Sequence, residues 1–127
     1  MEYRFEKHYT REEARALLPQ LREWLKQLNE LRSEQQRQEK RLNSLMSPGN
    51  DLGGNLVNSS IRTLADMQAI LLQFQSREIF IKDLERGLLD FPAILGGREV
   101  FLCWEQDEED VEHWHELDTG FAGRERL

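Results

Sequence analysis

Apolar side chains recur along residues 21–45 at alternating spacings of three and four, as in a helix with one apolar face. The positions of this heptad stripe are Leu21, Trp24, Leu28, Leu31, Gln35, Gln38, Leu42 and Leu45, of which the two glutamines are polar and fit a wet distal end or a polar register lock. Charged residues of both signs fill many of the positions between them, as on a solvated coiled-coil surface. The pattern predicts a helix over residues 19–46, about 40 Å long at a rise of roughly 1.5 Å per residue.

Two features bear on where the helical region begins. Thr10 and Glu13 are spaced as in a capping box, in which each side chain bonds the backbone amide of the other residue. Pro19 lacks the amide hydrogen that a helix interior requires. We therefore expect a short helix over 11–17 and a fresh start near Pro19.

A second amphipathic helix is expected over residues 56–77. Its apolar positions follow the helical period and are Leu56, Ile61, Leu64, Met67, Ile70, Leu71 and Phe74. Residues 47–54, rich in Gly, Pro and Asn, are predicted to form a turn. A short connection between two long helices favours an antiparallel hairpin.

The last third of the chain consists of short apolar runs bounded by turn residues, which is typical of strands. The predicted strands are 79–81, 88–91, 100–104 and 111–116, the last antiparallel to 98–104. Residues 100–104 are apolar throughout, so both faces of that strand should be covered. Leu95–Arg98 has the sequence of a hairpin turn, and Pro92 either ends its strand or marks a sheet edge.

Together these elements predict an α+β fold. A long antiparallel helical hairpin (10–77) should pack on residues 78–127, which are expected to form a small antiparallel β-sheet and a docked tail. The tail after Asp118 is predicted to be a loop. The chain length fits a single domain, 1–127.

The formal net charge of −7 is concentrated in one acidic segment that contains no Lys or Arg. The nine acids of residues 99–118 are Glu99, Glu105, Asp107, Glu108, Glu109, Asp110, Glu112, Glu116 and Asp118. This balance disfavours nucleic acid as a partner and is compatible with a basic protein partner. There is no apolar run long enough for a membrane span and no secretory signal, so a cytoplasmic protein is expected.

His113 and His115 are two residues apart and would point to the same face of a strand. With Glu116 and Asp118 they could hold a divalent transition metal. Cys103, the only cysteine, lies in an apolar strand, where a thiol is buried and has a raised pKa.

A second polar set has two interpretations. Its members are Glu85, Arg86, Asp90, Arg98 and Arg124, together with Glu116 and Asp118. They could form ion pairs that dock the C-terminal tail, because Arg and carboxylate groups pair in bidentate geometry. They could instead bind a small anionic or zwitterionic ligand, with His115 carrying a proton.

Three blocks of sequence and the opening Thr10–Pro19 carry a family resemblance. The blocks are KDLERGLLDFP (82–92), GREVFLCW (97–104) and WHELDTGFAGR (114–124). They resemble a bacterial family described as domain of unknown function 2203. The resemblance implies one domain with an N-terminal helical hairpin. It does not point to any particular activity. Its motif emphasises Glu85, Arg86, Asp90, Trp104, His115, Glu116, Asp118 and Arg124, and leaves out His113.

Two functions follow as hypotheses. Because the heptad stripe is longer than a few short strands can cover, the leading hypothesis is a self-associating hairpin module that forms a dimer. Its acidic C-terminal lobe would present a binding surface. The alternative is a small metal-binding protein or metal-dependent enzyme that uses the tail histidines and carboxylates.

Overall fold

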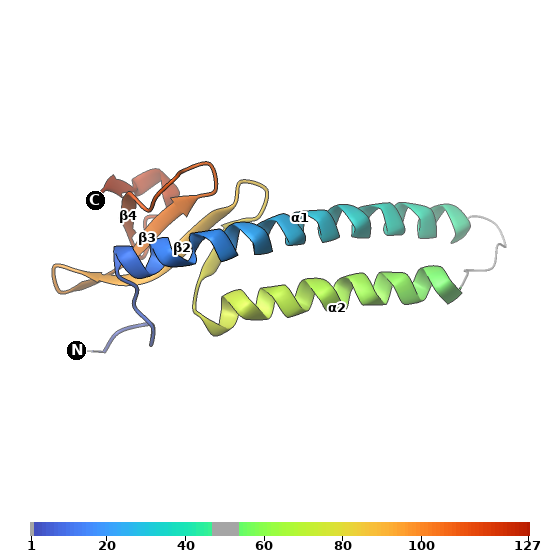
Figure 1. Ribbon diagram of the computed structural model, residues 1–127, viewed down its shortest axis with the longest axis horizontal. Coiled ribbons are helices and arrows are strands. Elements are labelled where there is room, and N and C mark those ends of the chain that lie inside the picture. The colour runs from blue at the N-terminus through green and yellow to red at the C-terminus, as the bar shows by residue number, and fades with distance from the viewer. Residues whose placement is uncertain (1, 47–53) are drawn as a thin grey trace.

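The computed structural model describes residues 2–46 and 54–127. Within them, helices α1 (Arg11–Met46) and α2 (Gly54–Ser76) run antiparallel as a long hairpin, and one end of the hairpin carries a β-sheet (Figure 1). The strands are β1 (Phe80–Asp83), β2 (Leu88–Leu95), β3 (Arg98–Glu105), β4 (His113–Glu116) and β5 (Glu125–Arg126), with a short 3₁₀ helix η1 (Phe121–Gly123) before β5. They pair antiparallel in chain order. The predicted α+β fold is confirmed.

The capping box at the start of α1 is confirmed. The Thr10 amide donates to Glu13 Oε1 at 3.0 Å, and the Glu13 amide donates to Thr10 Oγ1 at 3.1 Å. The turn predicted over 47–54 falls on residues 47–53, which lie outside the described ranges, and on Gly54, the first residue of α2.

The break predicted at Pro19 is wrong, because α1 is one continuous helix through this residue. Pro19 lies on the exposed side of α1, where water can reach the carbonyl that loses its hydrogen bond. An interior proline costs a helix about 3 kcal/mol. Ala14, Leu18 and Leu21 flank it and are buried against the sheet. Each buried leucine stabilises the helix by about 1.5–3 kcal/mol, enough together to outweigh the proline.

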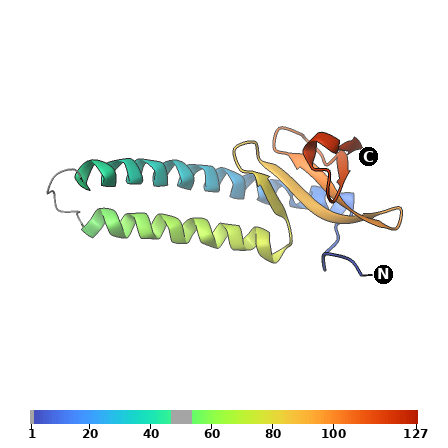
Figure 2. The same cartoon turned by 180° about the vertical axis from the view of Figure 1, so that it is seen from behind.

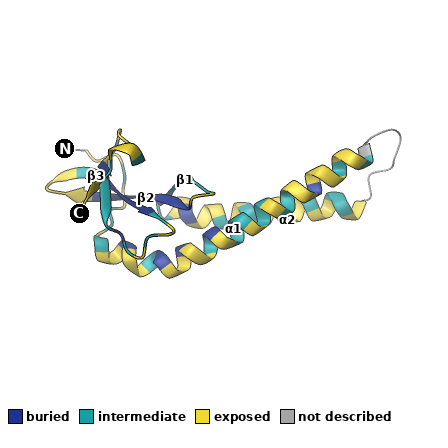
Figure 3. Ribbon diagram, turned by 90° about the horizontal axis from the view of Figure 1, so that it is seen from above, coloured by how far each residue is buried: buried dark blue, intermediate teal, exposed yellow. Residues whose placement is uncertain are grey.

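The core lies between the first half of α1 and one face of the sheet (Figure 3). From the sheet it takes alternate residues of β2 and β3, namely Leu89, Phe91, Ala93, Val100, Leu102 and Trp104. From α1 it takes Ala14, Leu18, Leu21, Leu25 and Leu28. All of residues 100–104 are buried, so the expectation that both faces of this strand are covered is confirmed.

The apolar residues of the helices divide between two environments. Leu28, which the heptad stripe assigned to self-association, is fully buried in this core, and Trp24 and Leu31 are half-buried. Leu64 and Leu71 of α2 are exposed. Among the large apolar side chains of the described helical residues, those left exposed therefore lie on α2. None of the helices within residues 2–46 and 54–127 is both long and apolar enough to cross a membrane.

The hairpin between β2 and β3 has the predicted two-residue turn. Gly96 and Gly97 have φ angles of 58° and 78°, the left-handed conformations that a type I′ turn needs. Strand β2 continues past Pro92 to Leu95, so the option that Pro92 ends its strand is wrong. The Pro92 carbonyl oxygen accepts a hydrogen bond from the Tyr9 amide at 2.7 Å, on the side of β2 away from β3. Pro92 thus lies at an edge that β1 does not reach.

The tail is not the loop that the sequence predicts. Strand β5 pairs with β4, with Trp114 opposite Glu125 and His113 opposite Arg126. The Leu127 amide then donates to the Glu112 carbonyl at 2.8 Å. The C-terminal end consequently lies at the sheet end of the molecule, where the N-terminal segment lies too (Figures 1 and 2).

Candidate functional site

The outer face of the sheet, away from α1, carries the candidate polar residues. Side chains alternate along a strand, so Asp90, Phe101 and Cys103 point away from the core that their neighbours fill. The N-terminal segment lies against this face. The Phe5 ring packs 5.2 Å from the ring of Phe80 and 5.3 Å from that of Phe101.

Three buried polar side chains meet on this outer face, one from each of β2, β3 and β4. They are Asp90, Cys103 and His115, with exposed fractions of 2%, 0% and 2%. His115 Nε2 lies 2.9 Å from both carboxylate oxygens of Asp90. One ligand atom from each of the three residues lies within 4.8 Å of the others. We call these three residues the buried triad.

Burial dominates the electrostatics of the triad. It raises the pKa of Asp90, and the interaction with His115 opposes that rise. Burial also raises the pKa of the Cys103 thiol to about 12, with a further contribution from the Asp90 charge. The expectation of a buried thiol with a raised pKa is confirmed. Cys103 is not a nucleophile in this state, because the thiolate is the reactive form.

The structure places the four residues of the predicted metal set apart from one another. His115 joins the triad, while the Nδ1 atom of His113 lies 3.4 Å from Glu108 Oε2 without hydrogen-bond geometry. Arg98 donates to Glu116 at 2.9 Å on the surface. Asp118 is exposed and lies 3.6 Å from Arg4. Among the described residues, the triad is the group of metal-ligating side chains that converge.

Part of the second polar set docks the tail. Arg124 donates to both carboxylate oxygens of Glu108, at 3.1 and 2.8 Å, and this pair is largely buried. The guanidinium groups of Arg86 and Arg124 both lie over the Phe121 ring, at 4.3 and 4.4 Å. Arg86 also donates to Glu105 at 2.8 Å. These contacts tie the tail to the end of β3.

The other members of that set lie elsewhere. Asp90 belongs to the triad, Arg98 pairs with Glu116, and Glu85 lies 3.8 Å from Arg32 on the surface. The seven residues therefore do not form one network.

Most of the acidic segment is paired within the chain. Seven of its nine acids lie within salt-bridge distance of a basic group, namely Glu99, Glu105, Glu108, Asp110, Glu112, Glu116 and Asp118. Asp110 accepts from Arg11 at 3.2 Å and from Arg15 at 2.7 Å. The Arg15 hydrogen bond lowers the pKa of Asp110 to about 2. The segment thus fastens α1 to the connection between β3 and β4.

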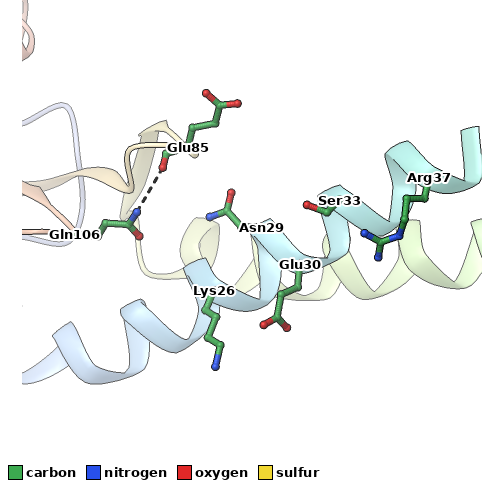
Figure 4. A pocket seen from close by; sticks show the side chains of 7 residues that line it. All are labelled: Lys26, Asn29, Glu30, Ser33, Arg37, Glu85 and Gln106. Atoms are coloured by element: carbon green, nitrogen blue, oxygen red, sulfur yellow. Dashed lines mark hydrogen bonds between the residues drawn. The ribbon is translucent and has the colours of Figure 1, made fainter. Parts of the chain in front are cut away.

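A shallow hollow of about 580 Å³ lies where α1 leaves the sheet (Figure 4). It is lined by Lys26, Asn29, Glu30, Ser33, Arg37, Glu85 and Gln106. Its two acids and two bases are all exposed, and Gln106 donates to the Glu85 carbonyl at 3.4 Å. With no buried charge in its lining, this hollow lacks the convergent polar groups of a ligand site.

Two features of the site escaped the sequence analysis. The sequence predicts Cys103 as a buried thiol with a raised pKa, but not as a ligand beside Asp90 and His115. The packing of the N-terminal segment was not predicted either. The alternation of Tyr3, Phe5 and Tyr9 with polar residues was a signal for it, because alternate aromatic residues suit an extended segment with one face on a sheet.

Comparisons with known proteins agree with the family resemblance. The family model described as uncharacterized conserved protein (DUF2203) matches residues 7–127. No curated protein and no solved structure matches the chain. Since the matched range covers nearly the whole sequence, this chain belongs to the DUF2203 family of uncharacterized conserved proteins.

Proposed function

We propose that this protein is a self-associating helical-hairpin module, in which α2 of one copy pairs with α2 of a second copy. The observation that carries the proposal is an uncovered apolar stripe on α2. Ile61, Leu64, Leu71 and Leu72 are 60%, 48%, 38% and 49% exposed. Clustered exposed apolar residues of this kind mark interaction sites on proteins.

The residues that share this stripe carry no charge. Ile61, Leu64, Gln68, Leu71 and Gln75 follow one another at alternating spacings of three and four, with Ala65 and Leu72 beside them. The charged residues of α2 are Arg62 and Asp66, and residues 67–76 have none. Near its C-terminal end the stripe reaches a largely apolar hollow of about 560 Å³, which Leu71 lines together with Phe5 and Phe80. An uncharged surface suits a partner with an equally uncharged surface.

The spacing of the stripe favours a second copy as that partner. Leu64 and Ala65 precede Gln68 by four and three residues, and Leu71 and Leu72 follow it by three and four. An antiparallel copy related by a two-fold axis at Gln68 places Leu64 against the partner's Leu72. The small Ala65 then faces the partner's Leu71. The two Gln68 amides can donate to and accept from each other across the axis.

This arrangement forms a four-helix assembly with a sheet lobe at each end. The hairpins contribute α2 to the interface and keep the charged α1 helices outside. The acidic lobes stay outside the interface between the two copies. A basic partner for them stays a prediction, because most of their acids are already paired within the chain.

Sedimentation velocity over a range of concentrations tests the proposal. The wild-type chain should sediment as a dimer of 15.1 kDa subunits. The double substitution Leu64→Glu/Leu72→Glu should give a monomer with an unchanged circular dichroism spectrum, because both side chains are exposed in one copy.

The matched control is Ile94→Glu/Leu95→Glu, which changes two similarly exposed apolar residues at the β2–β3 hairpin. This variant should remain a dimer. A wild-type chain that is monomeric at every concentration, or a Leu64→Glu/Leu72→Glu variant that stays dimeric, would contradict the proposal.

A further inference from the structure

In the buried triad, hydrogen-bond acceptors of His115 and Asp90 face each other. The inference drawn from this contact is independent of the proposed self-association. His115 Nδ1 lies 2.6 Å from the Glu116 carbonyl oxygen. A carbonyl only accepts, so the ring hydrogen is assigned to Nδ1. In a neutral ring, Nε2 is then an acceptor. It faces the two oxygens of Asp90, each 2.9 Å away, and these are acceptors as well.

Acceptors at this distance repel each other unless a positive centre lies between them. A second ring proton would make an imidazolium–carboxylate pair, both members of which are 2% exposed. Removing two charges from water to form such a pair carries a desolvation cost that their attraction must first offset. A proton on Asp90, whose pKa burial raises, would join the carboxyl and the imidazole as a neutral pair, but would join only these two groups. A metal ion would join all three members of the triad.

Cys103 supplies that third donor. Strand register puts it directly opposite Asp90 on β2, while on β4 His115 is paired with Phe101, two residues before Cys103. Sulfur, imidazole nitrogen and carboxylate oxygen are the ligand types that zinc binds, at about 2.0–2.3 Å. Ligands around one zinc ion lie roughly 3–4 Å apart, close to the spacing of the triad.

We infer that Asp90, Cys103 and His115 form a zinc site that ties β2, β3 and β4 together across the outer face of the sheet. The Nδ1 contact with the Glu116 carbonyl orients the ring, as the partner of a metal-bound histidine does. Asp90 can offer one oxygen or both, so three side chains provide up to four donor atoms. On binding, the sulfur gives its proton to solvent and the zinc–sulfur bond takes its place.

The surroundings accommodate the ion. Arg124 lies close to Cys103, but both of its terminal nitrogens donate to Glu108, which compensates its charge. Lys82 acts on Asp90 from an exposed position, where water screens it. The burial of all three ligands indicates a structural site, because a catalytic zinc keeps a position open to substrate.

The test uses the full chain purified without a histidine tag, stripped with a chelator and then loaded with Zn²⁺ or Co²⁺. We expect one metal ion per chain by elemental analysis, and a higher melting temperature with zinc than without it. The cobalt form should show the near-ultraviolet absorption of a sulfur-to-cobalt bond, which only the cysteine can supply.

One variant tests the cysteine ligand, and a second variant is its control. Cys103→Ala, a small change in volume, should abolish the sulfur-to-cobalt absorption while the circular dichroism spectrum stays folded. His113→Gln is the control, because His113 is on the same strand as His115 but outside the triad, and this variant should bind cobalt like the wild type.

A wild-type chain that stays folded and takes up no metal would overturn the inference, whichever ring nitrogens of His115 NMR then shows to be protonated. Cobalt binding without the sulfur absorption would overturn it too, because the metal would then lie elsewhere. Neither result bears on the oligomeric state, so this inference and the proposed function can fail separately.

Discussion

Leu25 and Leu72 are leucines on the two long helices, yet Leu25 is fully buried and Leu72 is about half exposed. Leu25 belongs to the core cluster that the first half of α1 shares with β2 and β3. Leu72 lies on a side of α2 that neither α1 nor the sheet covers. Leu25 therefore stabilises the fold of a single chain, whereas Leu72 remains exposed to contact a partner.

The polar residues show the same contrast. At the sheet end, Arg15, Arg86 and Arg124 each meet a carboxylate of the acidic segment. Along the hairpin, Gln38 donates to Thr63 at 3.0 Å between the helices, while the outer stripe of α2 has no charge. The sheet end is thus closed by contacts within one chain, and α2 is the surface that association would complete.

The largest expected effect tests the two leucines directly. Leu25→Ala should lower the free energy of unfolding by about 2–5 kcal/mol, because it leaves a cavity in the core. Leu72→Ala, measured at concentrations where the chain is monomeric, should change it by less than about 0.5 kcal/mol. Urea denaturation followed by tryptophan fluorescence gives both values, and equal losses would remove the distinction between the two regions.

A smaller effect is expected from the docked tail. Ending the chain at Leu117 removes Arg124 and leaves Glu108 without its bidentate partner. The free energy of unfolding should fall by about 1–3 kcal/mol, because the largely buried Glu108 loses its charged partner and β4 loses its pairing with β5. Calorimetry should show a lower melting temperature. Arg126→Ala, which removes an exposed ion pair of 3.7 Å, is the control and should melt like the wild type.

The smallest expected effect is on how the stability of the fold depends on pH in acid. The pKa of Asp110 is lowered to about 2 from its ordinary 3.8, first by the hydrogen bond from Arg15. Its folded-state pKa is below its unfolded value, so its stabilisation is complete above the unfolded pKa and is lost as pH falls through about 2. Asp110→Asn should flatten the acid limb of a denaturant-midpoint profile measured from about pH 6 down to pH 2. An unchanged profile would show that this ion pair does not hold α1.

Local signals predicted the fold well. The Thr10–Glu13 capping box and the Gly96–Gly97 turn depend on neighbours in the sequence, and both form as expected. The predictions of a break at Pro19 and of a loop in the tail were wrong for the same reason. In both places, contacts with residues distant in the sequence determine the structure. Burial beside Pro19 outweighs its missing bond, and pairing with β4 makes a strand of residues 125–126.

The triad could be predicted only in part. A two-residue turn at Gly96–Gly97 fixes the register of its hairpin and so puts Asp90 opposite Cys103. That pair was therefore accessible from the sequence. The position of His115 was not, because the connection from Gln106 to Glu112 is too long to set which residues of β3 and β4 face each other.

Crosslinking across the proposed axis tests the central claim about α2 most directly. Gln68→Cys should form an interchain disulfide under mild oxidation, because the two-fold axis brings both copies of this position together. Asn58→Cys is the control. Its two copies would be about 30 Å apart, since twenty residues of helical rise separate them. Cys103 is buried and should not take part. Crosslinking at position 68 alone is the predicted result, and none at 68, or equal crosslinking at 58 and 68, would contradict the account.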